Sequence, residues 1–230
     1  MAKIVILTGA GISAESGLGT FRDKDGLWTR YDLNDVATPE GFARNPALVH
    51  EFYNARRKNC FESEPNPAHI ALSRLENYYE GEVLIVTQNV DDLHERAGSR
   101  AVWHMHGELS RAKCADCDHR WSAPLEMTPG APCPACNSSA TRPDIVWFGE
   151  FPYHMDDIWD ALRAADLFVS IGTSGNVFPA AAFVQDAARA GARTLELNLE
   201  PSMGSHDFAE ARFGPASQLV PHWVDQVLGA

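Results

Sequence analysis

The strongest constraint on the fold of this chain is a series of short apolar runs that each stop abruptly at glycine or polar residues. The runs are rich in β-branched residues, and stretches with helical periodicity, such as MDDIWDALRAAD and PAAAFVQDAARAG, lie between them. Near-continuous apolar strands that alternate with helices predict an α/β fold with a doubly wound parallel sheet. The predicted strands are KIVILT at 3–8, Val83–Val86, Leu167–Ile171 and Thr194–Leu199, with RPDIVWFGE as a further candidate and a short last strand before a closing helix in ASQLVPHWVDQVLGA.

Length and charge narrow the class of protein. The chain has 230 residues, which is enough for one large α/β domain or such a domain with a small insert. Its formal net charge of -12 argues against direct binding of nucleic acid or of an anionic membrane surface. No apolar run approaches the ~18 residues of a membrane span, and the apolar stretch at the N-terminus is too short for a signal peptide. We therefore expect a cytoplasmic protein whose cysteines are metal ligands or free thiols.

Four of the five cysteines form two C-x-x-C pairs, Cys114 with Cys117 and Cys133 with Cys136. Each pair presents two thiolates from one tight turn, and two such turns complete the tetrahedral sulfur set of a zinc ribbon. The alternative is a pair of redox motifs, but the βαβ context of such motifs is missing. We expect one structural Zn²⁺ per chain, with no open position for catalysis. Cys60 stands alone and is expected to be a small buried residue or a spare thiol.

Small or polar residues follow each predicted strand. Because ligands of open α/β sheets bind at the carboxyl ends of the strands, these residues should converge on one crevice. The segments concerned are Gly9-Ala10-Gly11, Gln88-Asn89-Val90-Asp91, Gly172-Thr173-Ser174 and Asn198-Leu199-Glu200.

The first of these segments is a signal for a dinucleotide. Gly9-x-Gly11-x-x-Ala14 follows a strand, where glycines let backbone N–H groups approach a pyrophosphate. The motif alone is weak, and the acidic residue expected about twenty residues later is not clearly placed. Glu200 could hold a ribose instead. The stretch that follows, ISAESGLGTFRDKDGLW, has too many glycines for a long helix, and it is either a flap over the cofactor or an ordinary surface loop.

Two histidines alternate in the segment WHMHGEL, so His104 and His106 should face opposite ways. Either could be an ordinary core histidine. His106 lies before Gly107, at the junction of the sheet and the cysteine-rich insert, where an imidazole beside a ribose hydroxyl would be a plausible general base.

The segment HEFYNARRK at 50–58 is expected to be helical, with Tyr53 and Arg56 on one face because they are three residues apart. In an acidic protein this is either a solvated basic turn or a pair that faces a site. Arg57, one step round the helix, is expected to point elsewhere, so that its replacement should have little effect on activity.

Taken together, the motifs resemble those of sirtuins, the NAD-dependent protein deacylases, in order and over essentially the whole chain. They are GAGISAESG, FR, TQNVDDLHERAG, HMHGEL, the two C-x-x-C pairs, VWFGE, GTSG, NLEP and GPAS. The resemblance implies a discontinuous Rossmann-type NAD-binding domain at 1–30, 82–106 and 142–230. It also implies a helical module with acyl-pocket residues at 31–81 and a zinc ribbon at 107–141.

The resemblance also assigns roles, with His106 as the catalytic base and NAD as a cosubstrate. Residues that would hold NAD are Gly9, Ala10, Gly11 and Ser13 at the pyrophosphate, Phe21 and Arg22 in the cofactor loop, Gln88, Asn89 and Asp91 around the nicotinamide ribose, Gly172, Thr173 and Ser174 at the phosphates and adenosine ribose, and Asn198, Glu200 and Ala216 at the adenosine end. Val146, Phe148, Gly149 and Val177 belong to segments that would pair, as strands, with an extended acyl-lysine peptide.

The chemistry that the resemblance implies is acyl transfer and consumes NAD. The acyl oxygen of a modified lysine attacks the ribose carbon that carries nicotinamide, and nicotinamide leaves. His106 then takes a proton from a ribose hydroxyl, which attacks the acyl carbon. The products are lysine, nicotinamide and O-acyl-ADP-ribose. In the subgroup of bacterial and mitochondrial enzymes that remove succinyl and malonyl groups, a Tyr-x-x-Arg pair lies in the acyl pocket, and it matches Tyr53 and Arg56.

Three other functional classes remain open at this point. They are an oxidoreductase that uses NAD for hydride transfer, an ADP-ribosyltransferase on the same scaffold, and a non-enzymatic adaptor built on the zinc ribbon.

Overall fold

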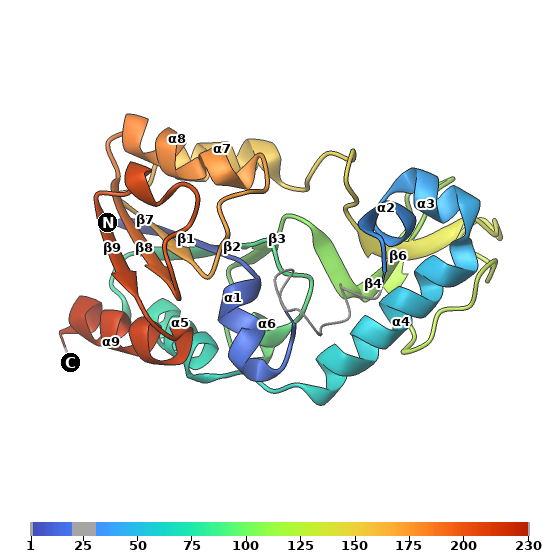
Figure 1. Cartoon of the computed structure of the whole chain (residues 1–230), viewed down its shortest axis with the longest axis horizontal. Coiled ribbons are helices and arrows are strands. Elements are labelled where there is room, and N and C mark those ends of the chain that lie inside the picture. The colour runs from blue at the N-terminus through green and yellow to red at the C-terminus, as the bar shows by residue number, and fades with distance from the viewer. Residues whose placement is uncertain (1, 20–30, 230) are drawn as a thin grey trace.

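The larger sheet confirms the predicted doubly wound α/β fold (Figure 1). The structure is a computed structural model that describes residues 2–19 and 31–229. Within them, six strands form a sheet in the order β3-β2-β1-β7-β8-β9, and all of their pairings are parallel. This is the Rossmann strand order, in which the winding direction reverses between β1 and β7. The bounds are β1 Lys3–Thr8, β2 Glu82–Thr87, β3 Val102–His104, β7 Leu167–Ile171, β8 Arg193–Asn198 and β9 Glu210–Phe213.

Helices cover both faces of this sheet, which explains why its strands are apolar on both sides. On one face α7 (Met155–Arg163) and α8 (Phe183–Arg189) pack against side chains such as Val5 and Phe168. On the other face α5 (Pro67–Tyr78) and α9 (Ala216–Leu228) pack against Ile4 and Ile6. Figure 1 shows the two helical layers above and below the strands. The short helices α1 (Ala10–Ser13) and α6 (Leu93–Arg96) begin just beyond the ends of β1 and β2.

A second, smaller unit lies beside the carboxyl ends of the large sheet's strands (Figure 1). Its sheet has the order β5-β4-β6 in the described part of the chain, with antiparallel pairing. Three helices pack against this sheet around a separate core that includes Phe52 and Trp147. The bounds are α2 Leu33–Val36, α3 Pro39–Arg44, α4 Pro46–Glu62, β4 Gly107–Cys114, β5 Arg120–Ser122 and β6 Thr141–Ile145.

Three helices begin at the same sequence signal, a capping residue followed by proline. Thr38, Asn45 and Asn66 each accept a hydrogen bond from a backbone N–H of the first turn, and a proline follows each of them. These caps fix where α3, α4 and α5 start. None of the helices within 2–19 and 31–229 is long and apolar enough to cross a membrane.

The structure differs from the sequence-based expectation in how segments are shared between the two units. The candidate strand at RPDIVWFGE forms as β6, but it pairs with β4 of the small sheet and does not join the large one. Helix α5, expected in the helical module, packs on the large sheet. The short last strand is β9, whereas the segment ASQLVPHWVDQVL is entirely helical. The domain bounds remain a proposal: strand pairing favours moving β6 to the small unit, and apolar packing favours moving α5 to the large one.

Arg57 ties α4 to the cysteine-rich insert. Its side chain is buried, and it donates from Nε to the Leu109 carbonyl at 2.6 Å and from Nη1 to the Leu125 carbonyl at 3.2 Å. Asn54, one turn earlier, exchanges hydrogen bonds with the backbone N–H and carbonyl of Met127. Arg57 therefore points away from Arg56, as expected, and it has a structural role that the sequence did not predict, since it pairs the carbonyls of Leu109 and Leu125.

Replacement of Arg57 by Met should lower the free energy of unfolding by about 2–3 kcal/mol, because buried hydrogen bonds from a charged group are lost and the two carbonyls are left unpaired. Urea unfolding measures the change. Lys58→Met is the matched control, because Lys58 is exposed on the same helix and its loss should change stability by less than about 0.5 kcal/mol. Equal effects of the two substitutions would contradict the role of Arg57.

Candidate active site

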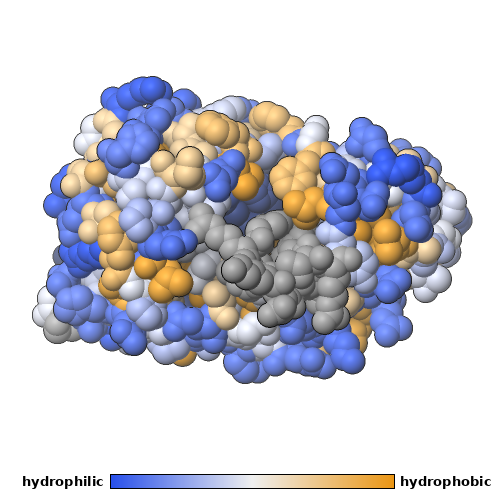
Figure 2. Space-filling model, in the orientation of Figure 1, coloured by the Kyte–Doolittle hydropathy of each residue, from blue (hydrophilic) through white to orange (hydrophobic). Residues whose placement is uncertain are grey.

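A cavity of about 880 Å³ opens between the two units, at the carboxyl ends of β1, β2, β7 and β8. Figure 2 shows this face of the molecule hollowed between the units, with hydrophobic residues along part of the rim. A cavity of this size is at the upper end of the range for small-molecule sites. Its position is the crevice that a doubly wound sheet offers to a ligand where the strand order reverses.

The predicted site residues in the described ranges converge on this cavity. Those that line it are Gly9, Ala10, Gly11, Ser13, Tyr53, Arg56, Gln88, Asn89, Asp91, His106, Val146, Phe148, Gly149, Gly172, Thr173, Ser174, Val177, Asn198, Glu200 and Ala216. Phe21 and Arg22 lie outside the described residues. Asn59 and Ala37, to which sequence reasoning gave no role, also line the cavity, as does Trp147, which was predicted only as part of the peptide-binding segment 146–149. The pattern VWFGE contained the signal for Trp147, a large aromatic residue inside a predicted binding segment.

The glycines after β1 are needed for contact between two backbone segments. A Cβ on Gly11 would lie 2.7 Å from the Cα of Gly172, and one on Gly9 would lie 2.9 Å from the Gly172 carbonyl oxygen. The N–H groups of Gly9 and Gly11 donate to the carbonyls of Ile171 and Gly172, at 3.0 and 2.9 Å. These two N–H groups therefore close the β1–β7 junction, which differs from the predicted role in holding a pyrophosphate directly.

Ser13 is the centre of a buried hydrogen-bond network under the cavity. Its hydroxyl accepts from Asn89 Nδ2 at 3.1 Å and donates to Asp91 Oδ2 at 3.1 Å. It also lies 3.3 Å from His69 Nε2, and since His69 Nδ1 accepts from the backbone N–H of Asn66, Nε2 carries the proton. The Ser13 hydroxyl is thus saturated within the protein, so it positions Asn89 and Asp91.

Burial sets the charge states in this network. Burial lowers the pKa of His69 to about 4, so its imidazole is neutral near pH 7. Burial raises the pKa of Asp91, while hydrogen bonds from the Leu93 N–H and the Ser13 hydroxyl oppose the shift. The network therefore places a neutral imidazole behind Ser13 and a heavily desolvated Asp91 carboxyl group at the cavity.

His106 lies at the rim of the cavity with one ring nitrogen exposed to it. Its Nδ1 lies 3.1 Å from the Gln88 carbonyl, which can only accept, so Nδ1 carries the proton and Nε2 keeps a lone pair. Burial lowers the pKa of His106, opposed by that hydrogen bond, so the imidazole is neutral near pH 7. Gly107 has φ +80°, and a Cβ there would lie 2.0 Å from the Asp144 carbonyl oxygen. Glycine is therefore required beside the histidine. The arrangement makes Nε2 a base.

His104 faces the other way, as the alternation predicts. It is buried, its Nε2 lies 2.7 Å from Glu95 Oε1, and its Nδ1 lies 3.2 Å from the Asn89 carbonyl. Burial lowers its pKa, but the Glu95 carboxylate outweighs burial, and the net shift is upward. His104 is a structural residue that supports the β2 end.

The far end of the cavity, on α4, carries Tyr53 and Arg56. The guanidinium carbon of Arg56 lies 5.7 Å from the Tyr53 ring centroid and 5.6 Å from that of Phe52. Burial lowers the pKa of Arg56, opposed by Tyr53 and Asp91, but a guanidinium remains charged at neutral pH. Burial raises the pKa of Tyr53, with Arg56 opposing the shift. A cation and a neutral phenol therefore line one apolar pocket.

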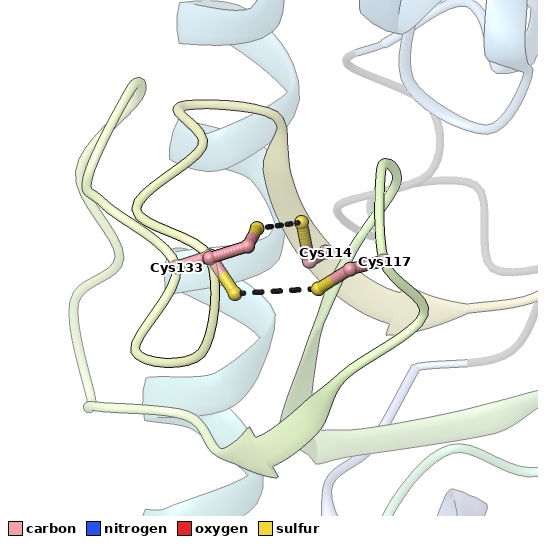
Figure 3. A group of neighbouring side chains, drawn as sticks. Cys114, Cys117 and Cys133 are labelled. Carbon is pink, nitrogen blue, oxygen red and sulfur yellow. Dashed lines mark hydrogen bonds between the residues drawn. The ribbon is translucent and has the colours of Figure 1, made fainter.

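The cysteine tetrad lies apart from this cavity. All four ligand atoms lie within 4.8 Å of one another, and Figure 3 shows the sulfurs directed toward a common centre. The Sγ atoms of Cys114 and Cys136 are 3.7 Å apart, and those of Cys117 and Cys133 are 3.8 Å apart. A tetrahedral ion with Zn–S bonds of about 2.3 Å separates its sulfurs by roughly 3.8 Å. The residues fit a closed, structural zinc site, which confirms the sequence-based prediction.

Comparison with known proteins places this fold and site in one family. A sequence model of the Sir2 family matches residues 9–179, and the chain belongs to that family. It is 58% identical over 230 residues to an NAD-dependent protein deacylase of Caulobacter vibrioides, covering 98% of this chain and 97% of that protein. An NAD-dependent protein deacylase of Vibrio cholerae is 54% identical, with 99% of this chain and 94% of that protein covered.

Solved structures support the same family assignment. A complex of a Sir2 homologue with NAD has a TM-score of 0.90 and 38% identity, with 98% of this chain and 89% of that chain covered. A Sir2 protein bound to an acetylated peptide has a TM-score of 0.84 and 27% identity, with 97% and 92% covered.

Replacement of His106 by Ala should lower kcat for deacylation by about 10²–10⁴-fold, because the base is removed while the cavity floor remains intact. Binding of NAD, measured by calorimetry, should be retained. His206→Ala is the control, since that side chain is 79% exposed. A well-folded His106→Ala protein with near-normal turnover would remove His106 from the mechanism.

Replacement of Cys114 by Ser should abolish binding of the one zinc expected per chain and unfold the insert before the Rossmann-type core, because the metal stabilises a segment with little core of its own. Elemental analysis and circular dichroism check both effects. Cys60→Ser is the matched control, since this buried thiol lies outside the tetrad, and it should keep the metal. Freshly purified protein that is active but contains no zinc would contradict this prediction.

Proposed function

We propose that this chain removes succinyl and malonyl groups, as well as acetyl groups, from protein lysines. As a member of the Sir2 family it is an NAD-dependent protein deacylase. The finer specificity rests on Arg56 and Tyr53. We also propose a cytoplasmic location, because the thiolates that the zinc tetrad requires persist in a reducing compartment.

The observation that carries the proposal is a guanidinium and a phenol in a pocket that is otherwise largely apolar. Arg56 lies close to the rings of Phe52 and Tyr53, and Tyr53 is only 1% exposed. An acetyl group offers nothing for this cation to bind. The distal carboxylate of a succinyl or malonyl group would form a charge-assisted hydrogen bond with Arg56, strengthened by partial exclusion of water.

His106 is suited to the proton transfer. NAD, when bound, supplies an ADP-ribosyl group with nicotinamide as the leaving group. The neutral Nε2 of His106 lines the same cavity as Asn89 and Asp91, the residues proposed to hold the nicotinamide ribose. It would accept the proton of a ribose hydroxyl, and the Gln88 carbonyl would stabilise the resulting imidazolium through Nδ1. That hydroxyl would attack the acyl carbon, and a water molecule would then complete the release of the lysine amine. The products would be lysine, nicotinamide and O-acyl-ADP-ribose.

The peptide would bind as an extended strand between two segments, 146–149 and 175–178. Neither segment forms a β-strand in the structure. The N–H groups of Val146 and Phe148 donate to the carbonyls of His106 and Ala37. These two N–H groups are therefore already paired within the protein and would not bind the peptide. Main-chain pairing along the rest of the two segments would give affinity for an extended backbone with little dependence on sequence.

Replacement of Arg56 by Met should raise KM for a succinyl-lysine peptide by about ten- to a hundredfold, which corresponds to the loss of about 1.5–3 kcal/mol for a hydrogen bond to a charged group. The ratio of kcat/KM for succinyl over acetyl peptide should fall by the same factor. Lys58→Met is the control, because it removes one positive charge from the exposed side of the same helix. Arg57 is unsuitable, since it is structural. Equal loss on both peptides would show that Arg56 is structural as well.

A further inference from the structure

We propose that Trp147 is a specificity-determining residue of the acyl pocket, which acts by aiming the Tyr53 hydroxyl proton at the distal carboxylate of the acyl group. The inference rests on the proposed function and extends it to a residue that does not itself carry the positive charge. Trp147 lies between Val146 and Phe148, in the segment proposed to bind the peptide, and it lines the same cavity as Tyr53.

The two side chains form a buried pair. Trp147 Nε1 lies 2.9 Å from the Tyr53 hydroxyl oxygen, and their ring centroids are 6.4 Å apart. Trp147 is 2% exposed and Tyr53 is 1% exposed. Solvent therefore has little access to the bond, and a buried phenol without a partner would be costly.

The direction of this hydrogen bond is fixed by chemistry. An indole N–H can only donate, so the phenol oxygen accepts from Trp147 and its own proton must point elsewhere. Burial raises the pKa of Tyr53, so the phenol stays protonated and remains a donor near neutral pH. Accepting one hydrogen bond also polarises the O–H group and strengthens the bond that it donates. The acceptor that this arrangement favours is the distal carboxylate of a succinyl or malonyl group bound beside Arg56.

The Trp147 indole is itself held in place by Arg142 and Glu150. The guanidinium carbon of Arg142 lies 3.3 Å from the Trp147 ring centroid, and Glu150 accepts from both terminal nitrogens of Arg142, at 2.7 and 2.8 Å. Glu150 Oε2 also accepts from the backbone N–H of Trp147 at 2.9 Å. The donor that orients Tyr53 is thus fixed by a partly buried ion pair and a stacked cation, and it has little freedom to turn away.

A double-mutant cycle tests the proposal. Trp147→Phe keeps an aromatic ring over Arg142 and removes the indole N–H, and Tyr53→Phe removes the hydroxyl. Trp147→Phe should lower the ratio of kcat/KM for succinyl over acetyl peptide by about three- to tenfold, the range of one neutral hydrogen bond, and the loss should appear in KM. In the Tyr53→Phe background, Trp147→Phe should leave that ratio unchanged. Trp159→Phe, in α7, is the matched control.

Independent, additive effects of the two substitutions on the ratio would overturn the proposal, because Trp147 would then act only as a pocket wall. An equal loss on both peptides from Trp147→Phe would overturn it as well. Failure of the proposed function can be told apart from failure of the inference on Trp147. If the proposed function is wrong, Arg56→Met leaves the succinyl-to-acetyl ratio of kcat/KM unchanged, and the inference on Trp147 is then wrong as well.

If Trp147→Phe does not fold, the unsubstituted protein labelled with nitrogen-15 tryptophan provides the test. It is titrated without NAD, using a succinyl-lysine peptide and then an acetyl-lysine peptide. The proposal expects one slowly exchanging indole N–H among the six tryptophans to shift with the succinyl peptide and not with the acetyl peptide. The absence of any succinyl-specific indole shift would overturn it.

Discussion

The contact between the β1 turn and the end of β7 is the constraint on which the site depends. Gly11 approaches Gly172 so closely that a Cβ at either position would meet backbone, at 2.7 Å and 2.5 Å. This contact joins the two halves of the doubly wound sheet at the point where the strand order reverses. The helices that leave β1 and β7 therefore diverge to opposite faces, and the cavity opens between them. A larger residue at Gly11 or Gly172 would separate the strands whose ends line the cavity.

Helix α4 serves two purposes through two adjacent faces. Tyr53 and Arg56 line the cavity, while Asn54 and Arg57, each one residue further along the chain, hold the cysteine-rich insert. Hydrogen bonds from this helix therefore connect the cysteine-rich insert to the element that carries Tyr53 and Arg56, although the metal site itself is closed. The same division explains why the two neighbouring arginines are not interchangeable: Arg56 lines the cavity, and Arg57 donates hydrogen bonds to backbone carbonyls.

Sequence could predict those features that depend on local pattern. The strands of the large sheet are runs such as Leu167–Ile171, whose bounds the structure reproduces, and the zinc tetrad follows from spacing alone. The position of the polar strand ends followed from the parallel topology, since such ends meet at one edge. The predicted role of His106 as the base needed the family resemblance, because alternation alone could not separate His106 from His104.

Features that depend on long-range pairing could not be predicted. Nothing in the sequence of β6 distinguishes pairing with β4 from pairing in the large sheet, and β9 is a short edge strand, EARF, with too few apolar residues to stand out. The saturation of the Ser13 hydroxyl by His69, Asn89 and Asp91 joins residues up to 78 positions apart. The Trp147–Tyr53 bond spans 94 positions.

The central claim is that the cavity performs NAD-dependent deacylation of lysine and accepts an acyl group with a distal carboxylate. The most direct measurement is mass spectrometry of acetyl-, malonyl- and succinyl-lysine peptides incubated with the protein, with and without NAD. The account predicts that each peptide loses its acyl group only when NAD is present, with nicotinamide and the matching acyl-ADP-ribose formed in equal amounts. Formation of NADH, or of a peptide that carries ADP-ribose and keeps its acyl group, would contradict it.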